Sequence, residues 1–119
     1  EKTIDASSDM VQKAKRIIKE QYTQQNLMIA NVAAEIGVSP NHLSCIFKQK
    51  TGKVLQNIWQ KMRIEKAKEL LKNTEFTNAE ISEKVGYGNP NYFSTVFHRT
   101  VGMTAKEYRE YVEKWRLWS

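Results

Sequence analysis

Two segments of this chain carry the same pattern of residues. Residues 31–52 align with residues 80–102 when one extra residue, Gly88, is allowed in the second segment. Apolar residues match apolar residues along both segments. The identical positions are Gly37 and Gly86, Pro40 and Pro90, Asn41 and Asn91, Ser44 and Ser94, Phe47 and Phe97, and Gly52 and Gly102. An internal repeat of this kind indicates that one supersecondary unit occurs twice.

Each copy of the repeat predicts a helix, a tight turn and a second helix. In the first copy, Gly37 suits the left-handed conformation that ends a helix, and Ser39 followed by Pro40 is typical of the start of the next one. Asn89 and Pro90 take these places in the second copy. The apolar residues that should face inward from the second helices are Leu43, Ile46 and Phe47, and Phe93, Val96 and Phe97. Two helix-turn-helix units are therefore predicted.

The residues around the repeat predict further helices. An apolar stripe without Gly or Pro predicts a long helix over residues 54–72, and two capping boxes, Thr77 with Glu80 and Thr104 with Glu107, predict two helix starts. The expected fold is all-α, with about seven helices in two helix-turn-helix subdomains joined by a long linker helix. A linker is expected at 1–9, and Ser7, Ser8 or Asp9 should cap the first helix. The other expected boundaries are the first subdomain at 10–53, the linker helix at 54–72, and the second subdomain with a C-terminal helix at 73–119.

The charge balance points to a negatively charged partner. Nineteen Lys and Arg residues outnumber 13 Asp and Glu residues, which gives a formal net charge of +6 and favours binding to a polyanion. The single cysteine, Cys45, excludes an internal disulfide, and His42 and His98 are too isolated to form a metal site. No apolar stretch is long enough to cross a bilayer. We therefore expect a cytoplasmic protein without a metal or other cofactor and without a membrane partner.

These residues together resemble the DNA-binding domain of the AraC/XylS family of bacterial transcription regulators. The resemblance covers residues 10–110, and its motifs are the run from Arg63 to Ala67 followed by Leu70 and Leu71, then Ile81 to Tyr87, Asn91 to Ser94, Phe97, Gly102 to Thr104, and Tyr108 with Arg109. The stretch from Val38 to Ser44, with Phe47 and Lys48, is similar to the versions at the C-terminus of two-component response regulators. Five residues depart from the family pattern. Ala105 stands where proline is usual, and His98 where lysine is usual. Cys45 and Thr95 stand where Arg or another long polar residue is common, and Met28 where a Ser or Thr cap is expected.

The resemblance implies that the second helix of each unit enters the major groove of DNA with its outward residues. The candidates for base contact are Pro40, Asn41, Ser44, Cys45, Lys48 and Gln49 in the first unit, and Pro90, Asn91, Ser94, Thr95, His98 and Arg99 in the second. A purely structural role in capping and packing is the alternative for Pro40, Pro90, Ser44 and Ser94. The candidates for phosphate contact are Lys50, Lys53 and Lys106. We expect Arg63 to bond a helix end rather than DNA.

The predicted function is sequence-specific binding of double-stranded DNA by a bacterial AraC-type transcription regulator, with two recognition helices in successive major grooves. Double-stranded DNA is the expected partner, RNA polymerase is a further candidate, and a sensing or receiver domain is expected upstream. The sequence has no nucleophile elbow, glycine-rich phosphate loop or carboxylate–histidine cluster, so enzymatic activity is not expected. The alternative is a helical interaction module that binds RNA or an acidic protein.

Overall fold

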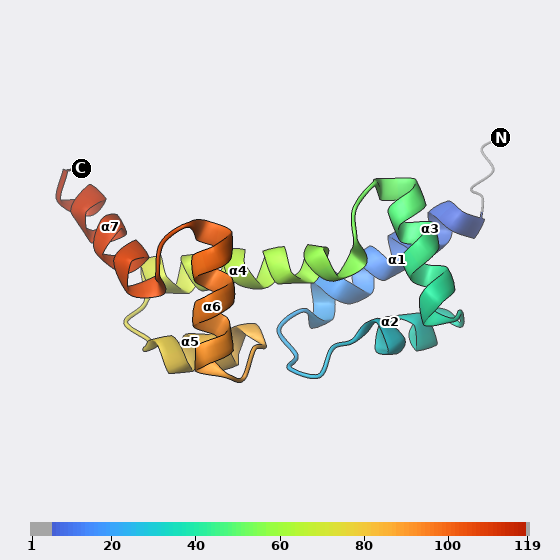
Figure 1. The fold of residues 1–119 in the computed structure, drawn as a ribbon, viewed down its shortest axis with the longest axis horizontal. Helices are drawn as coiled ribbons and strands as arrows, with labels where there is room; N and C mark the ends of the chain where they lie inside the picture. Colours follow the sequence, from blue (N-terminus) through green and yellow to red (C-terminus); the bar gives the residue numbers. More distant parts are fainter. Residues whose placement is uncertain (1–5, 119) are drawn as a thin grey trace. The chain divides into compact units, whose positions relative to one another are not determined.

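The computed structural model describes residues 6–118 as seven α-helices (Figure 1). They are α1 (Ala6–Gln21), α2 (Ile29–Ile36), α3 (Pro40–Thr51), α4 (Leu55–Asn73), α5 (Asn78–Val85), α6 (Pro90–Val101) and α7 (Ala105–Trp118). No strand occurs within this range. The all-α prediction and the two helix-turn-helix pairs, α2 with α3 and α5 with α6, are confirmed.

The chain forms two compact units that share the long helix α4. Unit 1 contains residues 6–22 and 26–61, and unit 2 contains residues 23–25 and 62–118. The boundary falls between Lys61 and Met62, inside α4. The predicted linker helix therefore exists over nearly the expected range, but its two halves supply core residues to the two units.

The first helix begins earlier than the sequence suggested. Residues 6–9 belong to α1, although they were expected to lie in a linker with Ser7, Ser8 or Asp9 as the cap. Asp9 lies in the first turn and pairs with Lys13 across 3.2 Å. An acidic residue near a helix N-terminus and an i,i+4 ion pair both favour the helical conformation, and this explains the difference. The remaining residues of the expected linker, 1–5, lie outside the described part of the chain.

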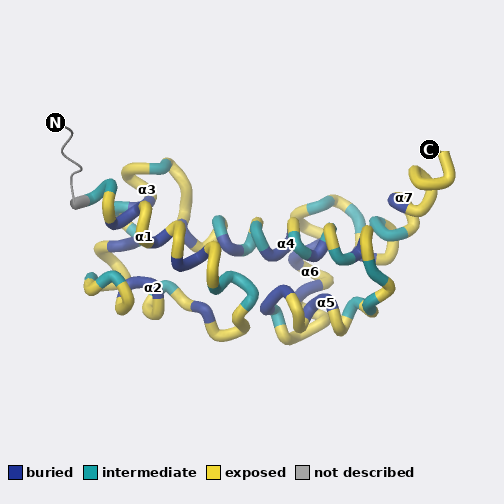
Figure 2. Tube along the Cα trace, turned by 180° about the vertical axis from the view of Figure 1, so that it is seen from behind, coloured by how far each residue is buried: buried dark blue, intermediate teal, exposed yellow. Residues whose placement is uncertain are grey.

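Unit 1 is a three-helix core closed by the first half of α4. Helices α1, α2 and α3 each pack against the other two, and their buried residues are the dark blue segments of the tube in Figure 2. The buried apolar residues of this unit are Met10, Val11, Ala14, Ile17, Ile18, Leu27, Val32, Ala33, Leu43, Phe47, Leu55 and Trp59. The predicted inward stripe of α3 is confirmed at Leu43 and Phe47, whereas Ile46 is only half-buried.

Unit 2 is built around one apolar cluster from α4, α5, α6 and α7. Its buried members are Ile64, Ala67, Leu71, Ile81, Val85, Phe93, Val96, Phe97 and Ala105. Aromatic rings continue from this cluster onto α7, with Phe97 next to Tyr108 at 5.8 Å between ring centroids and Tyr108 next to Tyr111 at 6.5 Å. The predicted inward stripe of α6 is confirmed at all three positions.

The predicted capping boxes form the starts of α5 and α7. The backbone N–H of Thr77 donates to Glu80, and that of Thr104 donates to Glu107, at 2.8 and 2.9 Å. Both carboxylates consequently have a pKa below the usual value, because the bond from the backbone N–H favours the charged form. The box at Glu107 holds the start of α7, where Ala105 replaces the proline of the family pattern.

The start of α2 lacks the side-chain cap expected of a Ser or Thr. Met28 occupies the cap position and makes no side-chain hydrogen bond to the helix. Instead Oδ1 of Asn31 accepts a hydrogen bond of 2.9 Å from the backbone N–H of Met28. A residue inside the first turn therefore bonds back to the cap.

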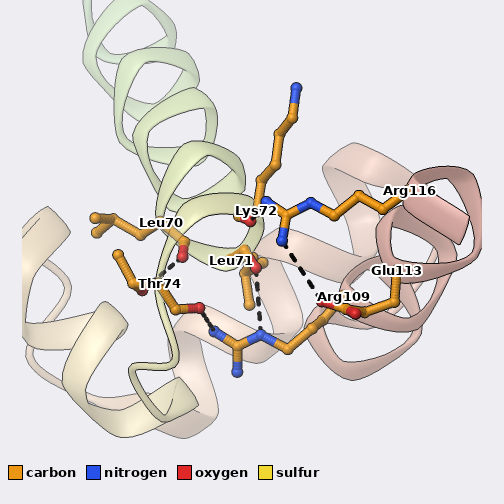
Figure 3. Close-up of polar contacts among 7 residues, drawn as sticks. All are labelled: Leu70, Leu71, Lys72, Thr74, Arg109, Glu113 and Arg116. Carbon is orange, nitrogen blue, oxygen red and sulfur yellow. Dashed lines mark hydrogen bonds and ion pairs between the residues drawn. The ribbon is translucent and has the colours of Figure 1, made fainter. Parts of the chain in front are cut away.

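Arginines of α7 hold the end of α4 (Figure 3). The Arg109 side chain donates hydrogen bonds to the carbonyl oxygens of Leu71, Thr74 and Phe76, at 3.3, 3.2 and 2.8 Å. Arg116 donates to the carbonyl oxygen of Lys72. Carbonyl groups at a helix C-terminus have no partner within the helix, so these bonds satisfy groups that local structure leaves open.

Candidate nucleic-acid interface

The first predicted recognition helix, α3, presents its candidate residues to solvent. Ser39 accepts a hydrogen bond of 3.2 Å from the backbone N–H of His42, and Pro40 opens the helix, as predicted. The apolar stripe faces the core and fixes the rotation of the helix, so the opposite side is outward. The candidates Pro40, Asn41, Cys45, Lys48 and Gln49 are exposed, and Ser44 is half-buried.

The second predicted recognition helix, α6, has the same construction. Oδ1 of Asn89 accepts hydrogen bonds from the backbone N–H groups of Asn91 and Tyr92, at 2.9 and 3.2 Å. All six candidates on this helix are exposed: Pro90, Asn91, Ser94, Thr95, His98 and Arg99. The hydroxyl of Thr95 already donates to the carbonyl oxygen of Asn91 at 3.1 Å, so it offers a ligand mainly its acceptor lone pairs.

Neither recognition helix contains an acidic residue. The segments 40–51 and 90–101 have no Asp or Glu, although the chain has 13 elsewhere. Basic residues lie in the last turn of each helix, Lys48 and Lys50 in α3, and Arg99 in α6. Both outward faces are therefore free of like-charge repulsion toward a polyanion.

The three lysines predicted to contact phosphate are exposed. Lys50 lies near the end of α3, Lys53 follows the glycine that ends it, and Lys106 lies in the first turn of α7. Their positions at helix ends beside the recognition helices agree with the sequence prediction. The role of each lysine stays a prediction.

Sequence reasoning missed an aromatic pair at the N-terminal end of α6. Tyr92 is 49% exposed and lies next to Asn91 on that helix. Its ring packs edge-on against Tyr87, with 5.6 Å between centroids. Burial is the main cause that raises the pKa of Tyr87 to about 12. The repeat could have indicated this site, because His42 is the equivalent of Tyr92 and a polar aromatic residue stands at both places.

Arg63 has a structural role, as predicted, but a different acceptor. Its side chain donates to the carbonyl oxygen of Gln24 at 2.7 Å, and Gln24 lies beyond the last residue of α1. Arg63 is also 5.2 Å from the ring centroid of Tyr87. A loop, rather than a helix end, therefore receives the bond.

The described residues hold neither a metal-binding cluster nor a membrane-spanning helix. Residues 6–118 contain no group of three or more His, Cys, Asp or Glu side chains that could hold a metal ion. Among the helices described, none combines the length and the apolar character needed to cross a membrane.

Comparison with known proteins identifies this architecture. Residues 32–111, which run from within α2 to within α7, match the protein family described as "Helix-turn-helix domain". The C-terminal domain of AraT, a response regulator from Geobacillus stearothermophilus, is 38% identical with a TM-score of 0.84, over 89% of this chain and 88% of that one. The chain belongs to the AraC-type helix-turn-helix domains.

Two further relatives of this AraC-type domain cover different amounts of their own chains. The C-terminal domain of the two-component response regulator YesN from Fusobacterium nucleatum is 36% identical with a TM-score of 0.82, over 86% of this chain and 99% of that one. The arabinose operon regulatory protein of Escherichia coli is 33% identical over 99 residues, 83% of this chain and 34% of that protein. The chain spans about a third of the length of the curated relatives it matches.

Proposed function

We propose that this AraC-type domain binds double-stranded DNA in a sequence-specific way and serves a transcription regulator. The observation that carries the proposal is the pair of helices α3 and α6, each capped at its start, buried along one stripe, and free of acidic residues on the exposed side. A helix of this kind fits the major groove, where its N-terminal outward residues contact base edges.

Two groups of residues have different roles in DNA binding, one in contacting bases and the other in contacting phosphates. The exposed side chains near the start of each recognition helix, Asn41 and Cys45 on α3 and Asn91 and Thr95 on α6, contact bases. Lys50, Lys53 and Lys106 contact phosphates, which fixes the register without selecting sequence. The excess of positive charge supports this division, because phosphate contacts supply most of the non-specific affinity.

A sensing or receiver domain upstream controls this DNA-binding domain in the proposed regulator, and RNA polymerase is a partner of the bound protein. The solved relatives that support this are C-terminal domains of response regulators. This chain covers about a third of the length of these curated relatives. The chain itself performs no catalysis in this proposal, since relatives of it are named as transcriptional regulators and activators.

Selection of bound duplexes from a random pool, followed by footprinting, tests the proposal. We expect one enriched motif, and we expect affinity for it to fall steeply as salt rises, because binding releases counterions from the DNA. The matched competitors are single-stranded RNA, folded RNA and an acidic polypeptide. Binding to any of these competitors without binding to a duplex would favour the interaction-module alternative and contradict the proposal.

A further inference from the structure

Three residues between α1 and α2 pack with unit 2 rather than with the helices that flank them. Thr23 to Gln25 belong to the same compact unit as residues 62–118. The carbonyl oxygen of Gln24 accepts the 2.7 Å hydrogen bond from Arg63, which is 6% exposed. A buried guanidinium is stable only with bonded partners. The bond therefore ties this segment to α4 of unit 2.

The same segment touches the turn of the second helix-turn-helix pair. Gly86 has φ +102°, and a Cβ added there would lie 2.7 Å from the carbonyl oxygen of Thr23 and 3.0 Å from Nε of Arg63. The repeat supplies a matched position, because Gly37 ends α2 as Gly86 ends α5. Gly37 has φ +91°, yet its Cβ would meet nothing within 4 Å. Only the second turn is pressed against another segment at this point.

Tyr87 extends the contact to the recognition helix. The guanidinium of Arg63 lies over its ring, 5.2 Å from the centroid. That ring in turn packs against Tyr92 at 5.6 Å and against Phe93 at 5.8 Å, and both are residues of α6. One arginine side chain thus joins the 23–25 segment, the turn and the start of α6.

We propose that residues 23–25 and Arg63 form a brace that positions α6 for base contact. Gly86 and Tyr87 are positioning residues of the same brace, because the first permits the close approach and the second passes the contact to α6. This inference rests on the proposed function of α6 as a recognition helix. The brace lies outside the pair α5 and α6, so the position of α6 depends on a contact with residues 23–25 and Arg63. The turn at Gly37 in the first pair has no such contact.

Hydrogen exchange tests the brace without DNA. The amides of Tyr87 and Gly88 donate to the carbonyl oxygen of Ser82 at 2.9 and 3.3 Å. In Arg63→Met, which keeps the apolar stem, we expect both amides to exchange about tenfold faster, as loss of one charged hydrogen bond implies. Val38 is the repeat equivalent of Tyr87, and its amide donates to Ala33 at 3.0 Å, as the neighbouring amide of Gly37 does at 2.8 Å. Neither of these two amides should change. Equal acceleration at both turns, or none at either, would overturn the brace.

Footprinting of the selected duplex then tests its effect on DNA binding. Arg63→Met should weaken protection of the segment whose base preference Asn91→Ala alters by about tenfold, and should leave the segment altered by Asn41→Ala within about twofold. Arg16→Met, at an exposed position of α1, removes the same charge and should weaken both segments equally and slightly. Failure of the wild-type chain to bind any duplex contradicts the proposed function. Normal wild-type binding with equal loss at both segments in Arg63→Met contradicts the brace alone.

A pair of glycine substitutions tests the brace if Arg63→Met does not fold. Gly86→Ala and Gly37→Ala share the strain of a left-handed backbone, but only the first places a Cβ against the backbone of Thr23. We expect Gly86→Ala to lower the melting temperature more than Gly37→Ala. Equal lowering by the two substitutions would overturn the inference.

Discussion

Two asparagines near the start of α6, Asn89 and Asn91, lie in different environments although they are two residues apart. Oδ1 of Asn89 is occupied by the backbone N–H groups that it caps. The exposed carboxamide of Asn91, one residue after the proline that opens the helix, remains available to a ligand. A free carboxamide can both donate to and accept from the edge of adenine in the major groove. The same residue type therefore caps the helix at one position and is the proposed base-contacting residue at the other.

Replacing these exposed asparagines should change base preference at single positions. We expect Asn41→Ala and Asn91→Ala each to lower discrimination at one base pair by about 1–3 kcal/mol. Lys53→Ala should instead weaken all sequences alike and reduce the salt slope by about one, because a phosphate contact carries no sequence information. Binding to a panel of duplexes that differ by one base pair measures both effects. Uniform losses across the panel for all three variants would contradict the assignment.

The capping carboxylates should make stability depend on pH in the acid range. Glu80 and Glu107 have a folded pKa below the ordinary value of 4.5, chiefly because each accepts a bond from a backbone N–H. A lowered folded pKa stabilises the native state above pH 4.5, and this contribution disappears as the pH falls through the folded pKa. In the variant with Glu80→Gln and Glu107→Gln, we expect the melting temperature to fall less between pH 6 and pH 3, roughly the range in which carboxylates titrate.

The same pH series with Glu65→Gln is the matched control. Glu65 is an exposed carboxylate on α4 whose ion pair with Lys68 spans 3.4 Å, and an exposed pair of this kind contributes little. A pH profile of the Glu80 and Glu107 variant that parallels the wild type would contradict the linkage.

At the scale of elements, α4 and α7 depend on each other through Arg109. Three carbonyl oxygens at the end of α4 and in the loop after it accept bonds from this one side chain, as Figure 3 shows for Leu71 and Thr74. Helix ends usually satisfy such groups with a local cap or with water. Here a residue more than 30 positions later provides the donors, so the end of α4 is complete only when α7 is docked.

Arg109→Met should therefore destabilise the protein by about 2 kcal/mol, since hydrogen bonds to a charged group are lost while the partly buried carbonyls remain. Urea unfolding measures the loss. Arg116→Met provides the comparison on the same helix, because Arg116 is exposed and its bond to the carbonyl oxygen of Lys72 is also exposed to water, unlike the part-buried bonds of Arg109. We expect it to cost less than about 0.5 kcal/mol. Similar losses in the two variants would contradict the special role of Arg109.

Local signals were sufficient to predict most of the elements. The caps at Ser39 and Asn89, the glycines that end the helices, and the buried stripes of α3 and α6 all depend on neighbours within one or two turns, so their residue types indicate them directly. The brace at Arg63 and the bonds of Arg109 join residues more than 30 positions apart. Residue spacing along the sequence does not predict such long-range contacts. The early start of α1 was missed because Ser and Asp are as typical of a linker as of a first helical turn.

At the scale of the whole molecule, one chain carries two different surfaces that are proposed to contact DNA. The equivalent outward residues differ at Cys45 and Thr95, Lys48 and His98, and Gln49 and Arg99. Helix α4, which contributes to both units, has 19 residues without Gly or Pro and is roughly 28 Å long at 1.5 Å per residue. Helix-turn-helix dimers obtain two half-sites through a twofold axis, whereas these two surfaces come from a repeat along one chain.

The DNA site should accordingly be asymmetric. We expect a single chain to protect two major-groove segments about one helical turn apart on a non-palindromic duplex. Inserting about five base pairs, half a helical turn, between the segments should abolish joint protection because it moves one segment to the opposite face. Footprinting with measured stoichiometry tests this expectation. A palindromic site that requires two chains and tolerates the insertion would contradict it.

The placement of residues 23–25 in unit 2 also bears on how such domains can be recombined. A chimera that joins two AraC-type domains at the boundary between Lys61 and Met62 takes Gly86 and Arg63 from one parent but residues 23–25 from the other. Arg63 and Gly86 contact the backbone of Gln24 and Thr23. The length and backbone conformation of that loop therefore matter more than the identity of its side chains. Hybrids between parents whose loops differ in length should lose recognition by α6 even when every residue of that helix is inherited intact.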